Sequence, residues 1–317
     1  MKAVGFTQFG GPEVLRVVEL PEPQAGRGQV RIRVAAADVN PSDILIRSGF
    51  ALRDHPEYPS AATTYVTGWD AAGVIDQIGE GVRDELALGM PALALVAPRR
   101  ASGAHAEFVV AAQESVVRAP TGVDLTEAST LLMNALTART FLDALDLAPG
   151  ATIAVTGAAG ALGGYSVELA KQAGFTVIAD ASAADTAVVA GFGADHVLAR
   201  GPRFAERTRR IAPAGVDGMI DAALVYQDAE HAVRDGAIVA TAREPVGPPS
   251  ARGVRRLCFG VQNHVHRTDL LEELRDQAAA GVLTLRVAGV FELGDAADAH
   301  RLLEKGGVRG RPVLAFG

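Results

Sequence analysis

The fold of this chain is decided by Thr152-Ile-Ala-Val-Thr-Gly157-Ala-Ala-Gly160-Ala-Leu-Gly163-Gly-Tyr-Ser-Val-Glu-Leu-Ala-Lys171. A β-branched apolar run, a glycine-rich turn and a helical pattern follow one another directly, which predicts a strand, a phosphate-binding turn and a helix. Gly157, Gly160 and Gly163 are spaced so that the chain can turn sharply, a pyrophosphate can approach the backbone, and the helix can pack on the sheet. The helix N-terminus adds free N–H groups and a partial positive charge. The stretch therefore predicts a dinucleotide site, with a purely structural turn as the alternative.

Length and composition indicate a two-domain globular enzyme. The 317 residues exceed the usual size of a single core, and the sequence is 49% hydrophobic and 21% charged. A net charge of −7 and the lack of a Lys/Arg run argue against nucleic acid as a partner. No apolar run approaches the about 18 residues of a membrane span, and no signal core follows Met1. We therefore expect a cytoplasmic protein without membrane contact.

The sequence offers no ligand set for a metal. Its single cysteine, Cys258, excludes an internal disulfide and a multi-cysteine zinc site. The histidines are scattered, and the pair His264-Val-His266 alone supplies too few ligands. We expect no metal, and without a Lewis acid the reversible oxidation of a plain alcohol is disfavoured.

The pattern of apolar and polar residues differs between two parts of the chain. In the N-terminal third, short apolar or alternating runs between Gly/Pro turns predict antiparallel strands over 14–20, 29–35, 68–82 and 108–110. Between them, residues 50–67 read as a long loop of the kind that often forms an active-site wall. From about residue 121 the pattern becomes helical, with one helix over 126–142, and strands then alternate with helices. The later elements are strands over 176–180, 194–198, 218–221, 237–241, 256–261 and 311–316, with helices over 268–280 and 295–305.

Six groups of residues in a fixed order carry a resemblance to a known family. They are Val39-Asn-Pro-Ser-Asp43 with Arg47-Ser-Gly49, Gly68-Trp-Asp-Ala-Ala-Gly-Val74 with Gly79-Glu-Gly-Val82, Leu136-Thr-Ala138, the glycine-rich unit, Gly193-Ala-Asp-His-Val197, and Ala299-His-Arg-Leu-Leu303 with Gly310-Arg-Pro-Val-Leu314. The chain resembles the medium-chain dehydrogenase/reductase superfamily, in its zinc-independent quinone oxidoreductase (zeta-crystallin-like) branch.

The resemblance implies an α/β protein of two domains. A GroES-like β-rich catalytic domain is expected from residues 1–120 and 263–317, and a Rossmann dinucleotide-binding domain with a doubly wound parallel sheet from residues 121–262. The cofactor is expected in the cleft between them. Members of the family commonly pair the open edge of the Rossmann sheet, here 256–261, so we expect a homodimer.

The resemblance also assigns residues to the site. Asn40 and Thr137 are expected beside the nicotinamide, and Asn40 is the one catalytic candidate. The alternative role of Asn40 is an Asx-turn before Pro41, and that of Thr137 is a hydroxyl on the surface of a helix. Leu45 replaces a tyrosine of many relatives, which leaves Tyr58 and Tyr65 as candidate proton donors, although Tyr65 stands where the family has a packing residue. The full set expected to contact the cofactor is Asn40, Thr137, Gly157, Ala159, Gly160, Ala161, Leu162, Asp180, Ser182, Arg200, Ala222, Thr241, Ala242, Phe259 and Val261.

The choice of cofactor depends on two residues. Asp180 stands 20 residues after Gly160, where an acid commonly binds the adenosine ribose and favours NADH. By resemblance, however, the discriminating position is Ala181, and Arg200 takes the place of a tyrosine near the 2′-phosphate. A guanidinium suits a phosphate, so NADPH is the expected cofactor and NADH the alternative.

The expected function is hydride transfer from NADPH to the conjugated C=C bond of an enone or to a quinone, because such a substrate is already electrophilic. One alternative is an enoyl reductase that acts on a pathway-specific or carrier-bound intermediate. An alternative of another class is a non-catalytic NADPH-binding protein, crystallin-like or redox-sensing. Turnover discriminates the enzymes from the binding protein.

Overall fold

Two compact units make up the computed structural model, which describes residues 1–50, 64–225, 230–244 and 248–317. The first unit comprises Met1–Met133, Gln262–Gly281 and Leu285–Gly317, and the second comprises Asn134–Val261 with Val282–Thr284. The predicted domain limits, 1–120 with 263–317 for one domain and 121–262 for the other, are not tested by this division and stay predictions.

A seven-stranded sheet forms the larger part of the first unit. Its strands run in the order β15-β16-β3-β5-β6-β8, and β7 pairs with β3. A three-stranded sheet with the order β2-β1-β4 completes the unit. The bounds are Lys2–Phe6 (β1), Arg16–Glu19 (β2), Gln29–Asp38 (β3), Tyr65–Val66 (β4), Asp70–Ile78 (β5), Pro91–Leu95 (β6), Phe108–Ala112 (β7), Val116–Arg118 (β8), Val287–Glu292 (β15) and Arg311–Ala315 (β16).

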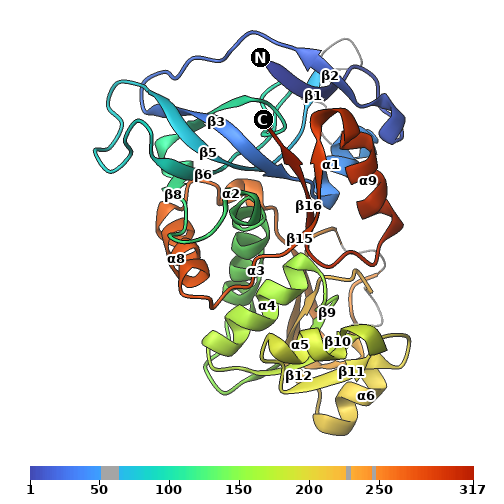
Figure 1. Ribbon diagram of the computed structural model, residues 1–317. Coiled ribbons are helices and arrows are strands. Elements are labelled where there is room, and N and C mark those ends of the chain that lie inside the picture. Colours follow the sequence, from blue (N-terminus) through green and yellow to red (C-terminus); the bar gives the residue numbers. More distant parts are fainter. Residues whose placement is uncertain (51–63, 226–229, 245–247) are drawn as a thin grey trace. The chain divides into compact units, whose positions relative to one another are not determined.

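Strand β3 is central to this sheet. Its alternate residues Val30, Ile32 and Val34 are buried in one apolar core, as the period of a half-buried strand requires. Strand β16, from the other end of the chain, pairs antiparallel with it, Val313 opposite Asp38. Both ends of the chain therefore build one sheet, which Figure 1 shows as a red strand beside a blue one.

Helices lie against the strands of the first unit. The helices α1 (Pro41–Arg47) and α9 (Ala296–Lys305) contact each other, and α9 also packs on β15 and β16 (Figure 1). The other helices of this unit are α2 (Leu125–Ala128) and α8 (Thr268–Ala279). Short 3-10 helices occur in both units at Pro12–Val14 (η1), Gln113–Ser115 (η3), Ala183–Asp185 (η4), Val261–Asn263 (η5) and Leu293–Asp295 (η6).

The second unit is a doubly wound parallel sheet, which confirms the predicted fold class. Its order is β11-β10-β9-β12-β13-β14, and every neighbouring pair is parallel. The strands are Thr152–Thr156 (β9), Thr176–Ala181 (β10), His196–Ala199 (β11), Val216–Asp221 (β12), Val233–Thr241 (β13) and Arg255–Cys258 (β14). Its helices in the described part of the chain include α3 (Leu132–Leu145), α4 (Ala161–Gln172), α5 (Thr186–Gly191) and α6 (Phe204–Ile211). Near-continuous apolar burial in β9 is typical of a strand covered on both faces.

Several predicted elements differ in extent from the structure. The helix over 126–142 is divided into α2 and α3, because the hydroxyl groups of Ser129 and Thr130 donate to the carbonyls of Thr126 and Glu127 and interrupt the helix. The sixth strand of the parallel sheet ends at Cys258, so the predicted extension of the strand to residue 261 is wrong.

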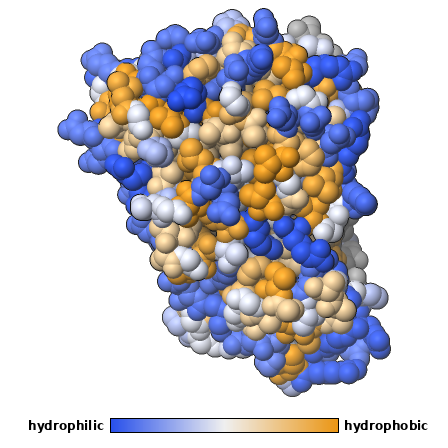
Figure 2. Space-filling view, viewed as in Figure 1, coloured by the Kyte–Doolittle hydropathy of each residue, from blue (hydrophilic) through white to orange (hydrophobic). Residues whose placement is uncertain are grey.

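Within the described residues, no helix is long and apolar enough to cross a membrane. Figure 2 shows hydrophilic residues along the rim of the first unit and hydrophobic residues toward the middle of the same face.

Candidate cofactor site

Most of the predicted cofactor residues lie along one edge of the parallel sheet in the second unit; Asn40 and Thr137 do not. Because all six strands run in the same direction, the residues at their carboxyl ends lie along one edge. The strand order reverses between β9 and β12, and ligands bind at such a switch point. The edge carries Gly157–Leu162 after β9, Asp180 and Ser182 at β10, Arg200 after β11, Ala222 after β12, Thr241 and Ala242 at β13, and Phe259 and Val261 after β14.

The glycine-rich turn has the backbone that a phosphate site needs. Gly157 has a φ of +67°, in the left-handed region that favours glycine. A Cβ atom at Gly163 would lie 2.2 Å from the carbonyl oxygen of Gly157, so only glycine lets α4 pack on the turn. Gly160 is the N-cap of α4, and the N–H groups of the first helical turn lack intrahelical acceptors. These donors and the helix dipole form an anion-binding end.

The turns after β9 and β12 touch at the switch point. A Cβ atom at Gly157 would lie 3.1 Å from the carbonyl carbon of Ala222. The buried carboxylate of Asp221 accepts hydrogen bonds from the Thr156 hydroxyl (2.6 Å) and from the Val225 N–H (3.0 Å). Asp221 therefore fixes both turns in place.

Asp180 faces the glycine-rich turn. One carboxylate oxygen accepts from the N–H groups of Gly157 (2.6 Å) and Ala158 (3.3 Å), and the other accepts from Arg200 Nε (3.0 Å). Asp180 is 3% exposed, whereas the Arg200 side chain is 47% exposed. Asp180 favours NADH by its position in the sequence and Arg200 favours NADPH. In the structure the two residues are hydrogen-bonded to each other.

Thr241 provides a second polar group at this edge. Its hydroxyl oxygen is buried and has no hydrogen-bond partner within the described part of the chain. Ala242 beside it is exposed. The Phe259 ring lies 6.1 Å from that of Phe141 in α3, and Val261 is buried. A buried hydroxyl without a partner at a ligand-binding edge indicates a place for a ligand atom.

Other predicted residues lie away from this edge or in other roles. The Ser182 hydroxyl donates to Asp185 at 2.5 Å. Thr137 lies in α3 and is 8% exposed. Tyr65 is 1% exposed and stacks on Phe6, which gives it the packing role of its family position. Tyr58 lies outside the described residues.

Asn40 belongs to a buried polar network in the first unit. Its amide nitrogen donates to Asp38 (2.7 Å) and its amide oxygen accepts from Arg311 Nε (2.8 Å). Its backbone N–H donates to Asp43, which also accepts from the Gly68 N–H. Asn40 has no exposed surface, so the network fixes its amide, and its contact with a ligand stays a prediction.

Sequence reasoning missed the ionisable members of this network. Asp38, Asp70 and Arg311 are buried, and the first two are acids at the ends of largely apolar segments. An acid that interrupts the apolar pattern of a central strand is the signal that could have found them.

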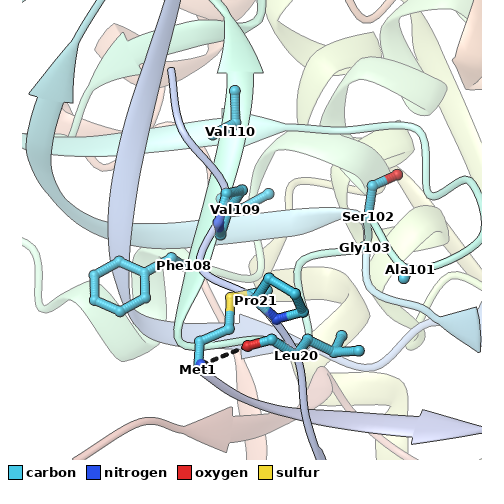
Figure 3. Close-up of a pocket in the computed structure, with 10 residues that line it drawn as sticks. Met1, Leu20, Pro21, Ala101, Ser102, Gly103, Phe108, Val109 and Val110 are labelled. Carbon is cyan, nitrogen blue, oxygen red and sulfur yellow. Dashed lines mark hydrogen bonds between the residues drawn. The ribbon is translucent and has the colours of Figure 1, made fainter. Parts of the chain in front are cut away.

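Within the described residues, the apolar pocket of the first unit and the metal-ligating side chains give no rival site. Figure 3 shows a pocket of about 180 Å³ in the first unit, lined by Met1, Leu20, Pro21, Phe108 and other mostly apolar residues, in which the Met1 ammonium donates to the Leu20 carbonyl. It lacks the convergent polar groups of a catalytic pocket. Within the described ranges, no three His, Cys, Asp or Glu residues are grouped to hold a metal.

Comparison with known proteins agrees with this geometry. Two family models match: an alcohol dehydrogenase GroES-like domain over residues 26–121 and a zinc-binding dehydrogenase over residues 192–314. An NADPH-dependent alkenal/one oxidoreductase of Arabidopsis thaliana is 28% identical over 325 aligned positions, which cover 99% of this chain and 79% of the relative. A quinone oxidoreductase of Lama guanicoe is 32% identical over 185 positions, 57% of this chain and 52% of the relative. A mycobacterial protein solved in complex with NADPH is 28% identical over 100% of both chains, with a TM-score of 0.85.

Proposed function

This chain belongs to the medium-chain dehydrogenase/reductase superfamily, and from this premise we propose that it is a zinc-independent, NADPH-dependent oxidoreductase. It transfers a hydride to the conjugated C=C bond of an enone or to a quinone. The relatives named as alkenal/one and quinone oxidoreductases support this substrate class. The observation that carries the proposal is the phosphate-binding turn with an arginine beside it, at the carboxyl edge of the parallel sheet.

The residues at this edge fit NADPH. The N-terminus of α4 and the glycine-rich turn would hold the pyrophosphate, because a side chain at Gly163 would fill the space that the turn occupies. The exposed guanidinium of Arg200 would pair with the 2′-phosphate. The buried Thr241 hydroxyl, which has no partner among the described residues, would gain one from the cofactor.

Binding and orientation are the main contributions of the protein to this reaction. When bound, NADPH supplies the hydride. The carbonyl of an enone or quinone spreads the incoming negative charge over its own atoms, so the chain needs to fix the geometry and offer hydrogen bonds to the developing enolate oxygen. Asn40 and Thr137 are the residues we propose beside the reacting atoms. Tyr58 is retained as a candidate proton donor.

The test is a panel of simple enones and quinones assayed for consumption of NADPH and of NADH. We expect turnover with NADPH to exceed turnover with NADH. Tight binding of NADPH without turnover of any panel member would instead favour the non-catalytic binding protein, and turnover restricted to thioester-bound enoyl groups would favour the enoyl reductase.

Assembly and location complete the proposal. Strand β14 ends the parallel sheet on one side, and an edge strand offers unpaired N–H and C=O groups to a second copy. We propose a homodimer that pairs these edges, acting on small molecules in the cytoplasm. The domain limits that go with it are 1–120 with 263–317, and 121–262.

A further inference from the structure

Asp180 lies within strand β10 and not beyond its end. Strand β10 includes Ala181, and the backbone N–H of Arg200 donates to the Ala181 carbonyl at 2.8 Å. Successive side chains of a strand point to opposite faces. The carboxylate of Asp180 is thereby placed against the N–H groups of Gly157 and Ala158, where it is 3% exposed.

This placement leaves few acceptor positions on the Asp180 carboxylate for the hydroxyl groups of a ribose. A carboxylate has about four lone-pair positions, and three donors already use the Asp180 oxygens: two backbone N–H groups and Arg200 Nε. To bind a ribose diol, Asp180 would have to give up the contacts that hold the turn. A buried acceptor abandoned in this way leaves its former donors unsatisfied, which is unfavourable.

Arg200 is held in a way that leaves its outer nitrogens available. Its Nε donates to Asp180 at 3.0 Å, and the side chain remains 47% exposed. A guanidinium is a planar fork with five N–H donors, so the two Nη atoms can bind a phosphate while Nε keeps its carboxylate. A lysine has a single ammonium group and cannot serve both partners with the same geometry.

We propose that Asp180 is a positioning residue that joins the phosphate-binding turn to Arg200, so that selectivity for NADPH depends on a carboxylate that does not itself contact the cofactor. The inference rests on the proposed function, since it concerns the same cofactor site. It replaces the assignment of Asp180 to the adenosine ribose and explains why an acid at this position is compatible with a 2′-phosphate.

Asp180→Asn separates the two roles of the carboxylate. The asparagine oxygen can still accept from the Gly157 N–H, but the amide NH₂ group cannot accept from Arg200 Nε. The turn is kept and the support of Arg200 is lost. We expect NADPH to bind about 2- to 5-fold more weakly, the range for a partly exposed charge pair, while NADH affinity changes by less than about 2-fold.

A double-mutant cycle with Arg200→Ala tests the coupling. If Asp180 acts through Arg200, then Asp180→Asn weakens NADPH binding in the wild-type background and has no further effect in the Arg200→Ala background. Affinities for NADPH, NADH and 2′,5′-ADP are measured by calorimetry; 2′,5′-ADP carries the phosphate without the nicotinamide. We expect kcat with NADPH at saturation to be preserved in Asp180→Asn, with the loss seen in KM.

The matched control is Asp217→Asn. Asp217 also joins a backbone N–H, that of Thr152 (2.9 Å), to an arginine Nε, that of Arg234 (3.0 Å), but it lies at the start of β12, at the opposite edge of the sheet. We expect this variant to bind both cofactors as the wild type does. A general effect of replacing one carboxylate in this sheet would appear in both variants.

Arg200→Lys gives a second test that leaves the buried acid intact. We expect it to lose about 3- to 10-fold in NADPH affinity and little in NADH affinity, because one ammonium cannot replace the fork. Three results would overturn the inference. Asp180→Asn could weaken the binding of NADPH and NADH equally, or it could weaken NADPH binding as much in the Arg200→Ala background as in the wild type. The third such result is wild-type NADPH affinity in Arg200→Lys. A wild-type protein that binds NADPH no better than NADH would contradict the proposed cofactor itself.

Discussion

The carboxyl groups of Asp38 and Asp70 are both buried in the first unit, and each is close enough to affect the ionisation of the other. Burial, with a smaller contribution from the nearby Asp43, raises the pKa of Asp38 to about 8 against the opposing effect of Arg311. Burial, together with the charge of Asp38, also raises the pKa of Asp70 well above its usual value. The pair therefore carries a proton at neutral pH.

The raised pKa values of these acids make the protein sensitive to alkali. The pKa of Asp38 is higher in the folded chain than the ordinary value of about 3.9, so the folded state binds more protons between these values, and stability falls as the pH rises towards 8. In Asp38→Asn, the amide oxygen can still accept from Asn40, and the side chain no longer carries a titrating proton. We expect the variant to be more stable than the wild type at about pH 9, by denaturant unfolding.

The exposed acid Asp84 is the control for this prediction. Asp84→Asn should leave the pH dependence of unfolding as it is in the wild type, because the side chain is in solvent. If Asp38→Asn and the wild type lose stability in parallel between about pH 6 and 9, the raised pKa of Asp38 is not the cause of the loss.

His300 makes the protein sensitive to acid by the opposite effect. Burial lowers its pKa well below the usual value, and the nearby His105 and Arg47 lower it further. Arg47 donates to its Nδ1 at 3.1 Å, so the ring proton is on Nε2, which has no acceptor among the described residues. The unfolded chain binds a proton near pH 6.5 and the folded chain does not, so stability falls as the pH drops below about 6.5.

His300→Gln removes this titration and keeps an acceptor for Arg47. We expect its unfolding free energy to fall less steeply than that of the wild type between about pH 6.5 and 5. His196→Gln, a change of an exposed histidine in β11, should follow the wild-type curve. If the unfolding free energy of His300→Gln falls as steeply as that of the wild type over this pH range, other groups cause the acid sensitivity.

Local signals in the sequence were sufficient for the parallel sheet of the second unit, whereas the fold of the first unit was predicted from the family resemblance. Residues 152–171 form the predicted strand, turn and helix, because a strand, a glycine-rich turn and a helix start are all determined within a few residues of one another. The parallel order of the other strands followed from their alternation with helices. What could not be predicted was the break at Ser129 and Thr130, since hydroxyls in a helical pattern bond either to solvent or back to the backbone.

The positions proposed for the candidate site come from the sequence, whereas the contacts of these side chains come from the structure alone. The spacing of Asp180 from the glycines is that of a ribose-binding acid, yet β10 extends to Ala181 and turns the carboxylate to the Gly157 N–H. The pair with Arg200 joins residues 20 positions apart through the packing of two strands, which no local pattern encodes. The buried acids beside Asn40 are likewise visible only after the strands are paired.

Gly163→Ala tests the phosphate-binding turn. The added methyl group would lie 2.2 Å from the Gly157 carbonyl oxygen, and backbone atoms cannot yield as a flexible side chain can, so the turn or α4 must shift. We expect affinity for NADPH and NADH to fall together by about 10-fold or more, since the pyrophosphate is common to both. In Gly191→Ala the new methyl group meets nothing within 4 Å, and binding should be unchanged. A Gly163→Ala protein with wild-type affinities would place the pyrophosphate elsewhere.

Metal removal tests the zinc-independent assignment. The chain has one cysteine, and its described residues group no three metal-ligating side chains. We expect dialysis against EDTA to leave the rate of enone reduction unchanged and the purified protein to contain no stoichiometric zinc. Bound zinc at one ion per chain, with activity lost on chelation and restored by zinc, would overturn the assignment.

The proposed homodimer can be tested at strand β14. Residues Arg255–Cys258 form the edge of the parallel sheet, and pairing with a second copy would satisfy their outward N–H and C=O groups. We expect a mass of about twice 32.8 kDa by light scattering at micromolar concentration. Amide hydrogens of this strand should exchange slowly at that concentration and faster on dilution, while those of the central strand β9 should not respond to dilution. A monomer mass, or exchange in β14 that is independent of concentration, would rule out the edge-paired dimer.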